Sequence, residues 1–218
     1  MASRELERII NNTQLGLSAL EGNMLSAAKG TEPRVICVTS CLPGEGKTTV
    51  AVSIANALAA RAGGNVLLVD GNQKTPRIHE LFEEKEAPGL MDVIADQAVP
   101  SEAIRSTSID RLQVLPIGTR GNKTKAAFSE QRFAQKLAEL RQRYSYVIFD
   151  GGSVLTSSDM SMLARHFDGV IFAVECEKTK IDMLEEAREN IQNAGGKVLG
   201  VFLNKRRYYI PRGLYGKV

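Results

Sequence analysis

Short apolar runs rich in β-branched residues recur along this chain, and segments with a helical spacing of apolar positions separate most of them. Such runs are typical of buried strands, so strands are predicted at residues 35–39, 66–69, 112–115, 146–149, 170–174 and 198–203. Helices are predicted at residues 48–61, 129–144, 158–165 and 181–194. This alternation predicts an α/β fold in which a mostly parallel β-sheet is flanked by helices on both faces.

The N-terminal residues carry a separate pattern of apolar positions with roughly helical spacing, which Gly16 interrupts. We expect a leading helical segment over residues 1–28, followed by the main domain over residues 29–218. At 218 residues the chain can bury one substantial core, so we expect a single globular domain overall. Residues 77–111 are expected to elaborate the connection between the second and third strands.

The composition, with 43% hydrophobic and 24% charged residues, is that of a soluble globular protein. Three cysteines without metal-ligand spacing predict neither a disulfide framework nor a zinc site. No apolar run approaches the ~20 residues of a membrane helix, and no signal-peptide pattern is present, so we expect a cytoplasmic protein. The formal charge is +3, and every charged residue from Lys197 onward is basic. This end is either a solvated tail or a contact for anionic lipid or an acidic partner. We expect no nucleic-acid partner.

A glycine-rich loop stands between the first predicted strand and the helix at residues 48–61. This strand-loop-helix order is the context of a phosphate-binding loop. Glycines let successive backbone N–H groups converge on phosphate at the positive end of a helix. We therefore predict that a nucleotide is bound by Pro43, Gly44, Glu45, Gly46, Lys47, Thr48 and Thr49.

Within this loop, Lys47 is expected to reach the outer phosphates and the Thr48 hydroxyl to take one position on Mg²⁺. Thr49 can contact an inner phosphate oxygen. The match to the motif GxxxxGK[ST] is incomplete, because Cys41 stands in place of its first glycine. The alternative interpretation is a tight loop that only caps a core helix.

Two carboxylates, Asp70 and Asp150, directly follow buried runs at residues 66–69 and 146–149. In an open parallel sheet, ligands bind at the carboxyl edge of the strands. Thr48, Asp70 and Asp150 are therefore the predicted metal ligands, and Lys47, Asp70 and Asp150 the predicted catalytic residues. The alternative for either carboxylate is a helix N-cap or a turn.

Three further polar residues carry weaker signals. Asp159 is interpreted as the start of a helix, with a switch role as the alternative. His79 and His166 lack partners at useful spacing and are interpreted as structural or surface residues.

Over about residues 23–215 the chain resembles the bacterial tyrosine kinases of the P-loop type, which are relatives of the septum-positioning and plasmid-partition ATPases. The resemblance is carried by residues 38–49, residues 67–76 together with His79, and residues 89–94, 146–150, 168–174 and 203–211.

The resemblance implies a Walker A loop at residues 41–48, a Walker A′ motif at Asp70 and a Walker B motif at Asp150. It also implies ATP and Mg²⁺ as cofactors, with Asn204 near the adenine. Such kinases phosphorylate tyrosines in their own or a neighbouring tail, which implies self-association. They also work with a transmembrane polysaccharide co-polymerase or chain-length protein, which implies recruitment to the inner face of the plasma membrane and a role in exopolysaccharide assembly or export.

The chain departs from the family pattern at several places. Asn72 replaces the second carboxylate of the Asp-x-Asp-x-Arg motif, and an amide cannot supply charge or accept a proton as readily. Gly151-Gly152-Ser153 replaces Thr-Pro-Pro after Asp150, which predicts a more flexible loop. The leading helix lacks the Glu-x-x-Arg-x-x-Arg motif for ring assembly and has Leu15, Ser18 and Glu21 there.

Tyr208, Tyr209 and Tyr215 are the candidate phosphoacceptors, and packing of this segment against the last strand is the alternative. Three functions remain open. The first is a protein-tyrosine kinase that phosphorylates itself, and the second is a degenerate kinase that acts as an ATP-dependent regulatory binding module. The third is a partition-type ATPase, although Ser40-Cys41-Leu42 lacks the additional lysine of that group.

Overall fold

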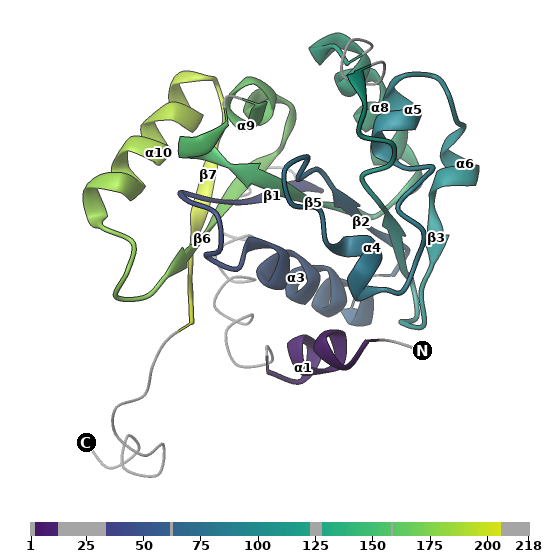
Figure 1. The fold of residues 1–218 in the computed structure, drawn as a ribbon, viewed down its shortest axis with the longest axis horizontal. Helices are drawn as coiled ribbons and strands as arrows, with labels where there is room; N and C mark the ends of the chain where they lie inside the picture. Colours follow the sequence, from purple (N-terminus) through teal and green to yellow (C-terminus); the bar gives the residue numbers. More distant parts are fainter. Residues whose placement is uncertain (1–2, 13–33, 62, 123–127, 158, 206–218) are drawn as a thin grey trace.

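A computed structural model of the protein describes residues 3–12, 34–61, 63–122, 128–157 and 159–205. Within these residues, seven strands form one sheet in the order β3-β4-β2-β5-β1-β6-β7 (Figure 1). The strands are β1 (Val35–Ser40), β2 (Val66–Asp70), β3 (Arg105–Ser106), β4 (Leu112–Leu115), β5 (Tyr146–Ser153), β6 (Gly169–Glu175) and β7 (Val198–Asn204). Every neighbouring pair is parallel except β3 and β4. The predicted fold class is confirmed.

The helices predicted in the main domain are present with bounds close to those predicted, and residues 77–111 contain three short helices that were not predicted. They are α1 (Arg4–Asn12), α3 (Lys47–Arg61), α4 (Ile78–Leu81), α5 (Leu90–Ile94), α6 (Pro100–Ala103), α8 (Glu130–Arg143), α9 (Asp159–Leu163) and α10 (Ile181–Asn193), with 3-10 turns η1 (Val154–Thr156) and η2 (Ala164–His166). The Ser129 hydroxyl caps α8 by accepting a hydrogen bond from the Arg132 amide. Gly195, with φ of +83°, follows the end of α10 and allows the chain to reverse there.

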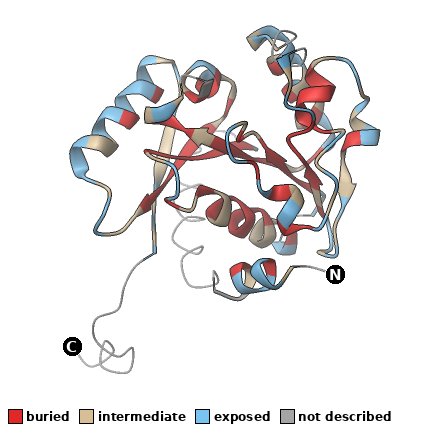
Figure 2. Ribbon diagram, viewed as in Figure 1, coloured by how far each residue is buried: buried red, intermediate tan, exposed pale blue. Residues whose placement is uncertain are grey.

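Alternate residues of β1 belong to two separate hydrophobic clusters, one on each face of the sheet. Figure 2 shows the central strands of the sheet coloured mostly as buried. Val35 and Cys37 pack with α5, α8, α9 and α10, whereas Ile36 and Val38 pack with α1, α3 and α4. Figure 1 shows these two groups of helices on opposite sides of the sheet. Burial on both faces explains why the strands read as continuous apolar runs and not as alternating ones.

The leading helix belongs to the same core as the main domain. In α1, Leu6 and Ile9 are buried in the cluster that contains α3, and Glu5 forms an ion pair of 2.8 Å with Arg77. The structure therefore confirms a helix from Arg4 to Asn12. The predicted continuation to residue 28 and the break at Gly16 lie outside the described residues.

Two features differ from the prediction. The sequence predicts a flexible loop after Asp150, whereas β5 continues through Gly152 to Ser153. Ser153 pairs with Ser40 of β1, and the Thr39 hydroxyl donates to the Gly152 carbonyl at 2.6 Å. The antiparallel strand β3 was not predicted, because two residues are too few to show a periodicity. Among the described residues, no helix is long and apolar enough to span a bilayer.

Candidate nucleotide-binding site

The phosphate loop connects β1 to α3, as predicted, and its geometry depends on two glycines. Gly44 and Gly46 have φ of +87° and +90°, in the left-handed region that favours glycine. Lys47 is the first residue of α3 and is buried. The loop therefore lies at the N-terminus of a 15-residue helix. The helix dipole makes this end positive, so a phosphate anion is favoured there.

Asp150 lies directly in front of this helix. The Thr48 hydroxyl donates a hydrogen bond of 2.7 Å to Asp150 Oδ2, and the other oxygen, Oδ1, is buried without a hydrogen-bond partner. The pKa of Asp150 is raised to about 8, chiefly by burial and also by the charge of Asp70, while the Thr48 hydrogen bond and the charge of Lys47 oppose the shift. A buried carboxylate of this kind is strongly stabilised by a nearby cation.

These residues fit Mg²⁺. The ion prefers hard oxygen ligands and usually combines one or two carboxylates with phosphate oxygens and water. Thr48 and Asp150 offer a hydroxyl and an open carboxylate oxygen at the end of the phosphate loop. In the part of the chain that the structure describes, His, Cys, Asp and Glu form no group of three that could hold a metal ion by themselves. A cation held jointly by the protein and a nucleotide suits this arrangement better than an all-protein site.

Asp70 lies beside Asp150 in the sheet, since the two residues are paired in the register of β2 and β5. Asp70 is fully buried, and its oxygens accept three backbone N–H groups, from Asn72 at 3.1 Å and from Arg77 and Ile78 at 3.0 Å each. Burial raises the pKa of Asp70 to about 6, although these hydrogen bonds lower it. The two predicted carboxylates are thus brought together, and Asp70 also shapes the loop at residues 71–77, called the A′ loop below.

Asn72, the residue in place of the family's second carboxylate, is engaged within the A′ loop. Its side-chain amide donates to the Thr75 carbonyl at 2.9 Å and to the Thr75 hydroxyl at 3.0 Å. Its side-chain oxygen accepts the Thr75 amide at 3.3 Å. The Asn72 side chain is almost completely buried. These hydrogen bonds form a local turn from Asn72 to Thr75. The A′ loop therefore carries no negative charge at position 72 to add to that of Asp70.

Two residues from the C-terminal part of the chain, Thr179 and Asn204, contact the phosphate loop at Glu45. The side-chain amide of Asn204 donates to the Glu45 carbonyl at 3.0 Å. The Glu45 carboxylate accepts the Leu42 amide at 2.9 Å and a hydrogen bond from the Thr179 hydroxyl. Asn204 therefore contacts the phosphate loop, and its place near the adenine stays a prediction. Sequence reasoning missed Thr179, because nothing near it in the chain indicates a contact with a loop 134 positions away.

Lys205 is a second contact that the sequence did not reveal. Its ammonium donates to the Gly44 carbonyl and forms an ion pair of 3.0 Å with Glu175. Because Lys205 immediately follows β7, the end of this strand is joined to the phosphate loop. The residues that follow, including the candidate phosphoacceptors Tyr208, Tyr209 and Tyr215, lie outside the described residues.

The two histidines have different surroundings. His79 lies close enough to Asp70 for its charge to lower the pKa of that carboxyl, and its Nδ1 atom is buried without a hydrogen-bond partner. His79 is therefore part of the surroundings of the site. His166 contacts Glu130 at 2.8 Å, which agrees with a structural role. Asp159 begins α9, as predicted.

Gly46→Ala and Gly44→Ala should differ in their effects, although both residues have a positive φ. A Cβ atom at Gly46 would lie 1.9 Å from the Asn204 side-chain nitrogen, whereas one at Gly44 would meet nothing within 4 Å. Both substitutions should lower the free energy of unfolding by about 1 kcal/mol through backbone strain. Gly46→Ala should cost about 1–2 kcal/mol more because Asn204 must leave the Glu45 carbonyl. Urea denaturation of both variants checks this, and equal losses would contradict it.

The parallel sheet, the glycine-rich loop at the start of α3 and the carboxylates at the ends of β2 and β5 define a P-loop nucleotide-binding protein. The family model described as an AAA domain matches residues 33–198. The chain is also 30% identical over 189 residues to the tyrosine-protein kinase CpsD of Streptococcus pneumoniae, covering 86% of this chain and 83% of that protein. The chain therefore belongs to the bacterial tyrosine kinase family of AAA-domain proteins.

Two further similarities bear on its role. The crystal structure of the VpsO kinase domain matches with a TM-score of 0.80 and 27% identity, covering 93% of this chain and 98% of that one. The succinoglycan biosynthesis transport protein ExoP of Rhizobium meliloti is 28% identical over 179 residues. These residues are 81% of this chain but only 23% of ExoP. In that protein, the segment similar to this chain is thus a small part of a longer one.

Proposed function

We propose that this chain is a Mg²⁺-ATP-dependent protein-tyrosine kinase that acts in the assembly or export of a polysaccharide. The observation that carries the proposal is the contact of Thr48 with Asp150 in front of α3, where the second oxygen of a buried carboxylate is left open. The names of the relatives support the kinase role and the link to polysaccharide.

Each predicted site residue has a role in this proposal. Residues 43–49 hold the phosphates, with Lys47 toward the outer ones, and Thr48 and Asp150 hold Mg²⁺ beside Asp70. The bound ion would neutralise negative charge on the phosphates. We assign adenine binding to the neighbourhood of Asn204, whose amide already lies behind the loop at Glu45.

The transfer step needs a proton acceptor for the tyrosine hydroxyl. The phenolic oxygen forms a bond to the γ-phosphorus, the bond from that phosphorus to the bridging oxygen breaks, and ADP leaves. Asp70 is assigned as the acceptor of the phenolic proton, because burial raises its pKa to about 6 and brings it near the working pH. Positioning and charge contribute most in reactions of this kind, so few protein groups are required.

We further propose that the protein works in the cytoplasm and is recruited to the membrane by a transmembrane co-polymerase or chain-length protein. The similarity to a segment of ExoP, named as a transport protein, supports a membrane partner. Self-association would let one copy phosphorylate the tail of another, with Tyr208, Tyr209 and Tyr215 as acceptors.

The kinase proposal is tested by incubating the purified protein with Mg²⁺-ATP beside the variant Lys47→Met. Mass spectrometry should find phosphotyrosine in the wild-type protein and none in the variant. An absence of phosphotyrosine from both proteins would refute kinase activity toward itself.

A second candidate function is an ATP-dependent regulatory binding module. It is favoured by Asn72, which stands where the family has a carboxylate and whose amide donates two hydrogen bonds to Thr75. Asn72→Asp should raise the rate of tyrosine phosphorylation several-fold if the missing charge limits transfer. It should also lower the free energy of unfolding by about 1 kcal/mol, since two hydrogen bonds to Thr75 lose their donor. Phosphotyrosine assays under single-turnover conditions check the rate. An unchanged rate would mean that the missing carboxylate does not limit transfer.

A further inference from the structure

The phosphate loop contains a negative side chain, Glu45, at the place where the proposed function puts a triphosphate. A carboxylate that turned toward the phosphates would repel them. Glu45 is only 4% exposed, so its side chain is engaged by the protein. The contacts that hold Glu45 therefore bear on how well the loop binds an anion.

Two hydrogen bonds hold the Glu45 carboxylate. One is local, because Oε2 accepts the Leu42 amide at 2.9 Å. The other comes from Thr179, whose hydroxyl donates to Oε1. Thr179 lies in the segment between β6 and α10, so this contact ties the loop to a neighbouring part of the sheet. Each carboxylate oxygen therefore has a donor within the protein.

The backbone of the loop is held as well, at Gly44. The Lys205 ammonium donates to the Gly44 carbonyl and forms an ion pair of 3.0 Å with Glu175. In a trans peptide unit the carbonyl and the following N–H point in opposite directions, so a donor that fixes the carbonyl also fixes that N–H. Gly44 has φ of +87° and no side chain to restrain its peptide units. Lys205 supplies a restraint that glycine itself cannot.

Both donors come from one region of the fold. Glu175 at the end of β6 pairs with Asn204 at the end of β7, and the Cys176 amide donates to the Asn204 carbonyl at 2.9 Å. Lys205 directly follows β7, and Thr179 lies shortly after β6. Figure 1 shows β6 and β7 ending at the same edge of the sheet. The two contacts therefore reach the loop from a common support.

We propose that Thr179 and Lys205 are positioning residues of the nucleotide site. They hold the Glu45 carboxylate and the Gly44 carbonyl away from the phosphates and leave the N–H side of the loop to bind them. The inference rests on the proposed function, because it requires a phosphate group at the loop. Without these donors, a carboxylate and a carbonyl oxygen would be free to turn toward the anion, and repulsion would weaken its binding.

Thr179→Val tests the first contact, because valine has nearly the shape of threonine and lacks the hydroxyl donor. It should raise the Kd for Mg²⁺-ATP, measured by calorimetry, about tenfold. Thr179→Ser keeps a hydroxyl and should bind Mg²⁺-ATP within about twofold of the wild-type affinity. Wild-type affinity in Thr179→Val would overturn the role of Thr179.

A double-mutant cycle separates positioning from a general effect on the fold. If Thr179 acts through the Glu45 carboxylate, Thr179→Val should change the Kd by less than about twofold in a Glu45→Ala background, where that carboxylate is gone. If Thr179→Val weakened binding as much in this background as in the wild-type protein, Thr179 would not act through Glu45, and the proposal would fail.

Lys205→Met tests the second contact against a matched control. Lys178 pairs with the same Glu175 carboxylate at 3.4 Å, and its side chain is 72% exposed. Lys205→Met should raise the Kd for Mg²⁺-ATP about tenfold, whereas Lys178→Met, which removes the same charge, should leave it within about twofold. An equal rise in both variants, or none in either, would overturn the role of Lys205.

These measurements need no phosphoryl transfer, so they separate this inference from the kinase function. Unchanged affinity in both Thr179→Val and Lys205→Met would overturn the inference and leave the kinase function standing. A wild-type protein that binds Mg²⁺-ATP but forms no phosphotyrosine would overturn the kinase function alone. A wild-type protein without affinity for Mg²⁺-ATP would overturn both.

Discussion

Asp150→Asn should make the nucleotide-free protein more stable at pH 8 and at the same time weaken its binding of Mg²⁺-ATP. The wild-type carboxyl has a pKa of about 8 in the folded protein, raised by burial, against about 4 in the unfolded chain. Between these values the folded state binds the extra proton, so the free energy of unfolding falls as pH rises from about 4 to about 8. The neutral amide avoids this loss, and we expect a gain of about 2 kcal/mol at pH 8.

Urea denaturation from pH 5 to pH 9 measures this effect. The wild-type protein should lose stability across the range, in part through Asp70, whose pKa is about 6. Asp150→Asn should lose less, because one of the two buried carboxyls no longer titrates. Calorimetry with Mg²⁺-ATP should show affinity lower by about tenfold or more, since a metal-binding oxygen is lost. If Asp150→Asn were less stable than the wild type at pH 8, the negative charge of Asp150 would already be compensated in the folded protein, and this prediction would be wrong.

Lys47→Met should strongly weaken nucleotide binding while leaving the fold intact. Lys47 is buried at the first position of α3, and its charge lowers the pKa of Asp150. A charge-assisted contact with phosphate contributes about 3 kcal/mol, so the Kd for Mg²⁺-ATP should rise about 100-fold. Methionine has a similar length and a good helix propensity, so α3 should persist.

The matched control for this experiment is Lys85→Met, because Lys85 is exposed and belongs to neither the phosphate loop nor the A′ loop. Its Kd should equal that of the wild-type protein in the same calorimetric titration. Circular dichroism of both variants should match the wild type. Wild-type affinity in Lys47→Met would show that the loop does not hold the phosphates in the predicted way.

The phosphate loop and the core strands can be predicted because their signals are local. A strand, a Gly-Lys-Thr loop and a helix stand next to one another in the chain, and the strands β1, β2 and β6 are apolar runs buried on both faces. The end of β5 could not be predicted in the same way. Gly151-Gly152 has the composition of a loop, and its strand conformation comes from pairing with β1 and from the Thr39 hydroxyl.

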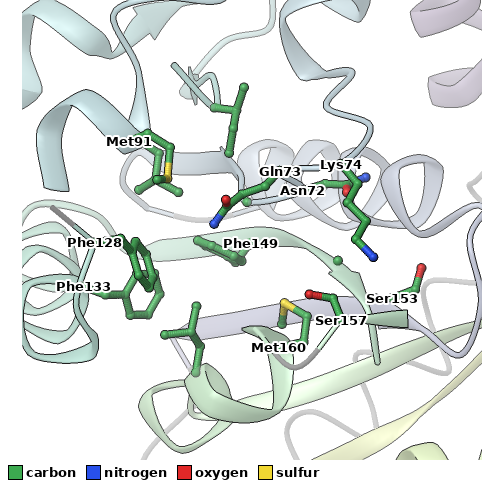
Figure 3. Close-up of a pocket in the computed structure, with 15 residues that line it drawn as sticks. Asn72, Gln73, Lys74, Met91, Phe128, Phe133, Phe149, Ser153, Ser157 and Met160 are labelled. Atoms are coloured by element: carbon green, nitrogen blue, oxygen red, sulfur yellow. The ribbon is translucent and has the colours of Figure 1, made fainter. Parts of the chain in front are cut away.

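The residues that surround the site could not be predicted, because they reach it through contacts between segments distant in the chain. His79 has no partner at useful spacing in the sequence, yet its charge acts on Asp70 in the folded protein. Thr179 and Lys205 reach the phosphate loop only because β6 lies beside β1 in the sheet and β7 lies beside β6. A small cavity lined by Met91, Phe133, Phe149 and Met160 likewise combines residues of α5, α8, β5 and α9 (Figure 3).

The sequence by itself determined the α/β fold, the position of the phosphate loop and the identity of two carboxylates at strand ends. These features follow from periodicity, from glycine and from residues that are neighbours in the chain. Only the tertiary structure decided that Thr48 contacts Asp150 across 102 positions and that Asp70 lies beside Asp150. The physical reason is that the strand order, set by burial of both sheet faces, brings together side chains that are distant in the chain.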